Sequence, residues 1–283
     1  MNRPFLKADA LLTDIREADE GADHFILWWL GQSGFLIKWD RQFLLFDPYL
    51  SDSLTKKYAA TDKPHVRMTE LVIDPAKLDC IDVITSSHNH TDHLDAETIT
   101  ALGLANPGLK LVLPEANIDF AKERLGDATP ELIGLDDGAV ETVGQFKFTG
   151  VAAAHNEVSR DISGHCQFLG FVVEFGPWCV FHSGDTLWHH GLVPALLPKK
   201  PDLMLLPING NKPERRVAGN LNGTEAAALA RACAARMVIP CHYDMFEFNT
   251  ASPEEFITSC ERLAQPHRVL LNGESWTSRA IDG

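Results

Sequence analysis

Short apolar stretches, separated by turn-forming residues, alternate along the chain with stretches of helical spacing. Residues 5–20 have the pattern of an amphipathic helix, and residues 24–30 have that of a strand. Residues 35–39 and 42–46 flank a polar pair, which predicts a hairpin. The same criteria predict further strands at 80–85, 110–113, 139–143, 145–153, 167–175, 178–182, 203–208 and 268–271, and further helices at 95–105, 115–125, 224–235 and 253–264.

Two of the predicted helices carry capping signals. Thr224 begins one of them, and Ser252-Pro253-Glu254-Glu255 has the form of a capping box with proline at the first helical position. Residues 51–75 have mixed charge and little periodicity, which predicts a long loop. Four basic residues make that loop locally positive: Lys56, Lys57, His65 and Arg67. It is either a lid over an anionic substrate or a solvated loop.

The order of the predicted elements is strands followed by helices, twice over. No internal repeat, linker or low-complexity tract divides the sequence. We therefore expect a single domain over residues 1–283. Two sheets packed face to face, with helices outside, would accommodate this α/β pattern.

The composition agrees with a folded domain, because 45% of the 283 residues are hydrophobic. No window approaches the ~20 apolar residues of a membrane span. Residues 1–20 lack the apolar core of a secretory signal. The six cysteines form no Cys-x-x-Cys pair and mostly fall in apolar stretches, as is typical of a reducing compartment. We expect a cytoplasmic protein that binds no membrane.

The chain is acidic, with 25 Lys and Arg against 39 Asp and Glu and a formal net charge of −14. Proteins that bind polyanions usually present a basic face, and none is visible here, so we expect no nucleic-acid partner. A small anionic ligand stays compatible with this charge, because the charges within a binding site can outweigh the net charge of the chain. The sequence leaves open whether the chain forms a homo-oligomer.

The densest group of reactive side chains follows the predicted strand at 80–85. Its His-x-His-x-Asp-His motif places three imidazoles and a carboxylate within six residues, on a loop between a strand and a helix. In extended chain His88 and His90 project to the same side. A turn at the helix entrance can direct Asp92 and His93 to a second point nearby. This spacing predicts a pair of metal ions, and helix capping by Asp92 and Asp95 is the alternative interpretation.

This motif resembles that of the metallo-β-lactamase-fold hydrolase superfamily. The resemblance requires three further ligands downstream, each at the end of a strand. His155 ends an apolar stretch, Asp185 lies in a Ser-Gly-Asp-Thr sequence, and His242 follows another short strand. The resemblance implies a four-layer αββα sandwich, with two mixed β-sheets flanked by helices.

The same resemblance implies how the ligands divide between two divalent cations. They would be His88, His90 and His155 for the first ion, Asp92, His93 and His242 for the second, and Asp185 as the bridge. Zinc and manganese are the expected metals, and iron is also compatible with such ligands. A water activated between the ions would attack the substrate, and the catalytic residue Asp92 could hold or accept its proton. Asp244 is the candidate partner that orients an imidazole.

Several further residues keep two interpretations. His165 begins a predicted strand and could replace His155 as a ligand, or contact the substrate; His155 is favoured because it follows the end of a strand. His189 either reaches the substrate or caps a loop. Asn209 and Asn220 offer amides suited to a polyhydroxylated ligand, or simply form turns.

The sequences around these asparagines resemble one branch of the superfamily. Leu206-Pro207-Ile208-Asn209-Gly210, Gly219-Asn220-Leu221-Asn222 and residues 239–246 are similar to ascorbate-6-phosphate-lactonase-like proteins. The leading hypothesis is therefore a metal-dependent hydrolase that opens a lactone or ester of a small anionic, sugar-phosphate-like substrate. The alternatives are a phosphodiester hydrolase using the same two metals, and a non-catalytic metal-binding scaffold of the same fold.

Overall fold

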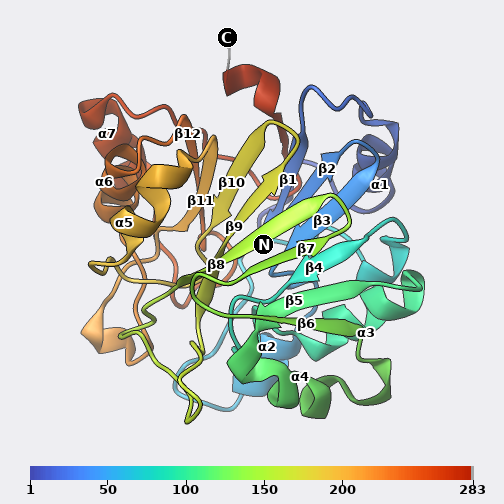
Figure 1. Ribbon diagram of the computed structural model, residues 1–283. Coiled ribbons are helices and arrows are strands. Elements are labelled where there is room, and N and C mark those ends of the chain that lie inside the picture. The colour runs from blue at the N-terminus through green and yellow to red at the C-terminus, as the bar shows by residue number, and fades with distance from the viewer. Residues whose placement is uncertain (282–283) are drawn as a thin grey trace.

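The computed structural model describes residues 1–281 and contains two mixed β-sheets that share a core (Figure 1). The first sheet has seven strands in the order β13-β1-β2-β3-β4-β5-β6, and the second has six in the order β12-β11-β10-β9-β8-β7. The strands are β1 (Ile26–Gly31), β2 (Gly34–Trp39), β3 (Gln42–Phe46), β4 (Val83–Thr85), β5 (Lys110–Pro114), β6 (Glu131–Leu135), β7 (Val140–Val143), β8 (Phe146–Ala152), β9 (Leu169–Phe175), β10 (Trp178–His182), β11 (Leu203–Pro207), β12 (Met237–Cys241) and β13 (Ser275–Thr277).

Helices flank this pair of sheets (Figure 1). They are α1 (Ala8–Glu17), α2 (Ser53–Tyr58), α3 (Ala96–Ala105), α4 (Ile118–Leu125), α5 (Leu192–Leu196), α6 (Gly223–Ala232) and α7 (Glu254–Leu263), with short 3-10 turns at Pro75–Lys77, Glu115–Asn117, Gly126–Ala128, Leu197–Lys199, Pro213–Arg215 and Ser278–Ile281. None of the helices in residues 1–281 has the length and apolar character needed to cross a membrane.

Both faces of the first sheet are buried, and β1 shows why. Successive side chains of a strand point to opposite faces. Leu27 and Trp29 belong to the core between the sheets. Trp28 and Leu30 instead join a second cluster, which includes Leu11 of α1 and residues of α3 and α4. The sheet therefore lies between the other sheet and a helical layer.

The second sheet is covered in the same way by α5, α6 and α7. The core that contains β10 and β11 continues into Leu192 and Leu196 of α5, Leu229 of α6 and Phe256 of α7. Figure 1 shows these three helices together on one side of the molecule and α1, α3 and α4 on the other. This arrangement confirms the expected α/β class, with two mixed sheets flanked by helices.

The predicted hairpin is confirmed, and its turn has a simple physical cause. Asp40 and Arg41 both have positive φ, +42° and +64°, as a two-residue turn of type I′ requires. The turn fixes the register between β2 and β3, which pairs Phe35 with Phe46. This hairpin places Gln32 and Asp47 at the same end of the sheet.

The strand directions bring the site loops to one edge. In the first sheet β3 and β4 are parallel. In the second sheet β10, β11 and β12 are parallel, and β8 runs in the same direction because β9 is antiparallel to both β8 and β10. The carboxyl ends of strands that share a direction meet at one edge, where open sheets place their ligand sites.

Two predictions about elements are wrong, and two elements are absent from the predictions. Residues 268–271 do not form a strand: after one bridge between Val238 and His267 the chain continues irregularly, and the closing strand is β13, which pairs with β1. The predicted loop 51–75 contains α2. The sequence does not predict strand β6, which contains Gly134, a residue that strands disfavour, or helix α5, which spans only five residues around Pro194.

The predicted helix caps also differ from the observed ones. Asn222 caps α6, through a capping box in which it exchanges hydrogen bonds with Glu225, and Thr224 lies inside the helix. At α7 the capping box does not form; Ser252 Oγ accepts a hydrogen bond from the Glu254 amide at 3.3 Å. Pro253 is the residue that precedes the first turn of α7, and its ring fixes φ at a value suited to a helix start. The helix begins there without a side-chain cap.

Candidate metal centre

The candidate metal centre lies where loops of both sheets meet. The loop after β4 carries His88, His90, Asp92 and His93, and the other candidates follow strands of the second sheet. The structure brings all seven predicted ligands together: His88, His90, Asp92, His93, His155, Asp185 and His242. Their candidate ligand atoms form three overlapping groups, and within each group these atoms lie within 4.8 Å of one another.

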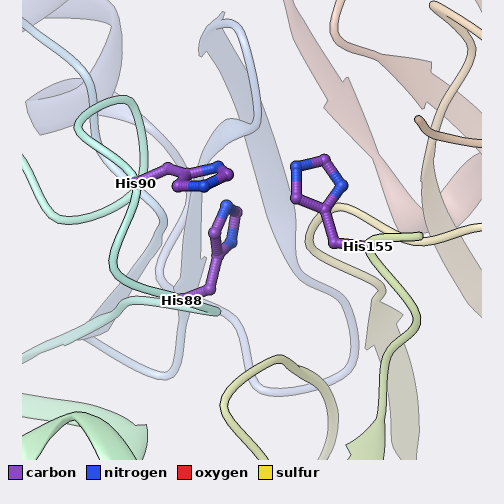
Figure 2. Close-up of side chains that lie close together, drawn as sticks. All are labelled: His88, His90 and His155. Carbon is purple, nitrogen blue, oxygen red and sulfur yellow. The ribbon is translucent and has the colours of Figure 1, made fainter. Parts of the chain in front are cut away.

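Three histidines form the first group. Ring centroids are 4.5 Å apart for His88 and His90, 5.3 Å for His88 and His155, and 5.0 Å for His90 and His155. Figure 2 shows the three rings directed toward a common space. Three imidazoles converging on one point match the first predicted ligand set.

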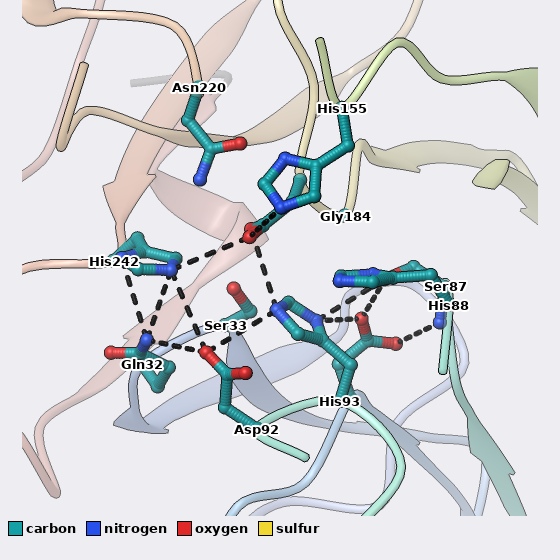
Figure 3. Close-up of polar contacts among 12 residues, drawn as sticks. Gln32, Ser33, Ser87, His88, Asp92, His93, His155, Gly184, Asn220 and His242 are labelled. Atoms are coloured by element: carbon teal, nitrogen blue, oxygen red, sulfur yellow. Dashed lines mark hydrogen bonds and ion pairs between the residues drawn. The ribbon is translucent and has the colours of Figure 1, made fainter. Parts of the chain in front are cut away.

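Asp185 connects this group with the remaining ligands. One of its carboxylate oxygens lies 3.4 Å from His93 Nε2, and the other lies 3.7 Å from His155 Nε2 and 3.6 Å from His242 Nε2. Asp92 Oδ2 lies 3.7 Å from Nε2 of both His93 and His242. Asp185 therefore stands between the two predicted ligand sets, as a bridging carboxylate would (Figure 3).

Three of the converging atoms are buried and have no hydrogen-bond partner within residues 1–281. They are His88 Nε2, His93 Nε2 and Asp185 Oδ1. Buried polar atoms are rarely left without a partner, since this costs about 1–3 kcal/mol each. The three atoms belong to one group with the spacing of metal ligands. The residues present therefore fit a bound cation.

The hydrogen bonds behind the rings direct lone pairs toward the centre. Ser87 Oγ donates its only hydrogen bond to Asp47, so it accepts a hydrogen bond from His88 Nδ1, which lies 3.0 Å away. His155 Nδ1 donates to the carbonyl of Gly219 at 3.1 Å. In each ring the other nitrogen, Nε2, is then the unprotonated one that faces the ligand group.

Asp47 is the main residue that the sequence did not reveal. Its Oδ2 lies 2.6 Å from His93 Nδ1, and its Oδ1 accepts hydrogen bonds from Thr85 Oγ1 and the Ser87 amide at 2.8 and 3.0 Å. Burial alone would raise the pKa of this carboxyl group, but nearby His182 and His93 hold it below its ordinary value. Asp47 orients an imidazole, the role that the sequence had suggested for Asp244.

Asp244 is placed differently. Its amide donates to Thr250 Oγ1 and its carbonyl accepts from Thr69 Oγ1, so its backbone holds the neighbouring loop. Burial raises the pKa of its carboxyl group. No imidazole in residues 1–281 forms an ion pair or hydrogen bond with that carboxylate.

Gln32, in the turn between β1 and β2, is a second unpredicted contact. Its side-chain amide donates to Asp92 Oδ2 at 2.8 Å and lies 3.0 Å from His242 Nε2 (Figure 3). The amide of His242 in turn donates to the carbonyl of Gln32. Both residues have left-handed backbone conformations, with φ of +50° and +63°. Such strain in non-glycine residues is concentrated at functional sites.

The buried charges of this cluster favour a positive partner. Burial disfavours protonation of His93, yet the carboxylates of Asp185 and Asp92 raise its pKa well above the ordinary value. Burial likewise opposes ionisation of Asp185, but His93 and His242 hold its pKa well below the ordinary value. Buried carboxylates require a positive partner. A cation held by these ligands would supply that partner.

The other predicted site residues lie outside the ligand group. His165 is partly exposed, with Nδ1 3.6 Å from Asp161. His189 Nε2 donates to the carbonyl of Ala152 at 2.9 Å, which ties it to the end of β8. Asn220 and Asn209 are buried and hydrogen-bonded to each other at 3.0 Å. Asn220 Oδ1 has no partner within the described residues, and Figure 3 shows the side chain directed toward the ligand group.

A pocket of about 420 Å³ opens above the ligands. Its lining includes His90, Asp92, His155, Asp185 and His242. This volume lies in the range of sites for small molecules. The arrangement can therefore hold cations at the bottom of a pocket that admits a small substrate.

Comparisons with known proteins agree with this geometry. The family model described as the beta-lactamase superfamily domain matches residues 26–242, from the start of β1 to His242. A UPF0173 metal-dependent hydrolase of Methanosarcina mazei is 28% identical over 254 residues, covering 87% of this chain and 96% of that protein. Another, of Rubrobacter xylanophilus, is 32% identical over 181 residues, covering 62% of this chain and 69% of that protein.

The fold is shared with solved structures. The metallo-beta-lactamase fold protein YhfI of Bacillus subtilis is similar with a TM-score of 0.66 at 18% identity, covering 90% of this chain and 100% of that one. The family model and the relative that is 32% identical together show that this chain belongs to the β-lactamase superfamily domain family and, within it, to the UPF0173 metal-dependent hydrolases.

Proposed function

We propose that this metal-dependent hydrolase holds two divalent cations and opens a lactone, or a similar ester, of a small anionic molecule. One observation carries the proposal. Three buried ligand atoms without hydrogen-bond partners in residues 1–281 converge on one point, below a pocket of about 420 Å³. Asp185 lies between the two sets of candidate ligands, which supports two ions over one.

The ligands would divide between the two ions as the family resemblance implies. The first ion would be held by His88, His90 and His155, and the second by Asp92, His93 and His242. Asp185, which lies near histidines of both sets, would contact both ions. Histidine-rich sites with carboxylates suit zinc or manganese, and iron is also compatible. When bound, such a pair of cations lowers the pKa of a coordinated water and polarises the bond under attack.

The side chains of the site have distinct tasks in this proposal. Asp47 and Ser87 hold the imidazoles of His93 and His88 in the tautomers that ligation requires. Asp92 Oδ2 accepts a hydrogen bond from Gln32. The second carboxylate oxygen of Asp92, Oδ1, would then accept the proton of the attacking water. The proton thus moves to a carboxylate that lines the substrate pocket.

A lactone or ester is favoured over a nucleic acid because of charge and size. The chain has a formal net charge of −14, and polyanion binders usually present a basic face. The pocket has room for a small molecule. Similarity to the ascorbate-6-phosphate-lactonase-like branch around Asn209 and Asn220 further suggests a phosphorylated sugar acid lactone.

Elemental analysis joined to a small substrate screen tests the proposal. We expect two equivalents of zinc or manganese per chain, and hydrolysis of sugar lactones in preference to a chromogenic phosphodiester. His88→Ala should lose both metal and activity, whereas His165→Ala, at a histidine outside the ligand group, should keep the metal. Turnover of the phosphodiester alone would overturn the substrate class. A purified protein that takes up no metal would overturn the mechanism.

A further inference from the structure

Outside the candidate metal ligands, the pocket wall is positive. Lys57, Lys63 and Arg124 line the pocket. The carboxylates that line it are those of Asp92 and Asp185, which are both candidate ligands. This local excess of positive charge stands in a chain whose formal net charge is −14. Clefts lined by one sign of charge concentrate ligands of the opposite sign.

These three cations have only neutral hydrogen-bond partners within residues 1–281. Lys57 Nζ donates to Thr91 Oγ1 at 3.1 Å, and Lys63 Nζ donates to the carbonyl of Arg216. Lys56, next to Lys57, instead pairs with Glu97 at 2.8 Å. The charge of Lys56 is therefore neutralised outside the pocket, and that of Lys57 is not.

Lys57 is directed toward the pocket by its helix. Leu54 of α2 is buried in a small cluster with Tyr49 and Phe246, and Tyr58 packs against it. Leu54, Lys57 and Tyr58 lie on one face of α2, three and four residues apart, and all line the pocket. The contact with Thr91 holds the ammonium beside the loop that carries the ligands. An ammonium has three donors, so Lys57 keeps two for a ligand.

Lys63 connects two loops at the pocket. Its bond to Arg216 reaches the segment that contributes Val217 and Ala218 to the lining, and an ion pair between Arg216 and Asp62 joins the same loops. Lys63 also retains two free donors. Its place is thus fixed by the backbone while its charge stays available to a ligand.

Arg124 has a different task. Its Nη1 donates to the carbonyls of Asn89 and Leu94 at 2.7 and 3.1 Å, and its guanidinium lies 4.3 Å from the Phe120 ring centre. It therefore fixes the loop that carries the candidate metal ligands. Because its removal would also disturb that loop, the role of the positive wall is tested at the two lysines.

We infer that Lys57 and Lys63 bind an anionic substituent of the substrate, a carboxylate or a phosphate, on the side of the molecule away from the reacting bond. The inference rests on the proposed function and makes these lysines its specificity-determining residues. Each ammonium would form a charge-assisted hydrogen bond to the oxyanion. Because this part of the substrate does not react, the lysines would lower KM more than they raise kcat.

Three γ-lactones test this inference: one bears a neutral hydroxymethyl group, one a carboxylate and one a phosphoryloxymethyl group. The wild-type protein should prefer one or both anionic lactones over the neutral one. A comparison of the carboxylate lactone with the phosphoryloxymethyl lactone then identifies which anion is bound. Lys57→Ala and Lys63→Ala should each lower the ratio of kcat/KM between the preferred anionic lactone and the neutral one about tenfold. The matched control, Lys56→Ala, removes the same charge and should leave the ratio unchanged.

Two further readouts decide the interpretation. The KM of the wild-type protein for the anionic lactone should rise with salt, less steeply in Lys57→Ala, since salt screens exposed charges. Equal ratios in all four proteins would overturn the inference. Should none of the lactones be hydrolysed, the proposed function fails, and the lysines are then tested by calorimetric titration with inorganic phosphate. If phosphate affinity falls in the two lysine variants but not in Lys56→Ala, the result supports anion binding by Lys57 and Lys63. Equal affinity in all of these proteins overturns it.

Discussion

At the scale of single residues, the site depends on groups behind the ligands as much as on the ligands. Asp47 receives hydrogen bonds from His93 Nδ1, Thr85 and Ser87, and is fully buried. A carboxylate behind a ligating imidazole fixes the tautomer and strengthens the ligand. The residues most informative for mutation are therefore Asp47 and its neighbours.

Asp47→Asn should weaken metal binding while keeping the fold. The amide has the size of the carboxylate but presents N–H to His93 Nδ1, which favours the wrong tautomer. We expect about 10- to 100-fold lower metal affinity, measured by competition with a chromogenic chelator. Asp82→Asn is the matched control, since Asp82 accepts the Phe43 amide at the other end of β4. An unchanged affinity in Asp47→Asn would show that Asp47 does not support the site.

Gly184 is a second residue beside the ligands that cannot be replaced without cost, because its position has no room for a side chain. It precedes Asp185 with a φ of +56°, and an added Cβ would lie 2.4 Å from Ser87 Cβ. Gly184→Ala should lower the free energy of unfolding by about 2–5 kcal/mol, from left-handed strain and overpacking together. Gly108→Ala separates the two effects, since Gly108 has a φ of +90° but nothing within 4 Å of the added Cβ. Urea unfolding of both variants should show the larger loss at Gly184.

The sequence located the candidate ligands better than the residues that support them, for a physical reason. Four candidates form one dense local motif, and the family resemblance directed attention to strand ends for the other three. Asp47 precedes a proline and has the local signature of a turn. Its contact with Ser87 exists only because β3 and β4 are parallel neighbours. Gln32 likewise reaches Asp92 and His242 only in the folded chain.

At the scale of elements, segments with a clear apolar pattern or helical spacing were predicted well, and segments whose structure depends on a tertiary pairing were not. The hairpin of β2 and β3 follows from alternation, and helix α3, which Asp95 caps, follows from its helical composition. Strand β13 has three residues, and its place beside β1 is a tertiary pairing that no local pattern shows. The helix starts differ for a related reason, because competing cap residues stand close together in the sequence.

The cap of α6 can be tested directly. The side-chain oxygen of Asn222 accepts a hydrogen bond from the backbone amide of Glu225 at 2.9 Å. In return, the Glu225 carboxylate accepts one from the backbone amide of Asn222 at 2.9 Å. Asn222→Ala should therefore lower the free energy of unfolding by about 1 kcal/mol, measured by urea denaturation. Ser252→Ala, at the exposed residue before α7, should cost less than half as much. A larger loss at Ser252 would contradict the observed cap geometry.

At the scale of the whole molecule, the candidate centre joins the two sheets. His88, His90, Asp92 and His93 follow β4 of the first sheet, whereas the remaining three ligands follow strands of the second. Each of the three ligand groups contains residues from both sheets. A cation bound to any group therefore links the sheets, and its affinity adds to the stability of their packing.

Removal of metal should consequently destabilise the fold as well as the activity. Binding to the folded state alone contributes about 4 kcal/mol when the free metal is 1,000 times its Kd, which corresponds to a Tm shift on the order of 10 °C. We expect this fall in Tm after a chelator is added and dialysed away, and recovery with zinc or manganese. His155→Ala, which removes a link from the second sheet, should show a smaller metal-dependent shift, whereas His165→Ala should keep the full one. An unchanged Tm, with loss of metal verified by elemental analysis, would mean that the sheets hold together without the ions and that the cluster contributes to chemistry alone.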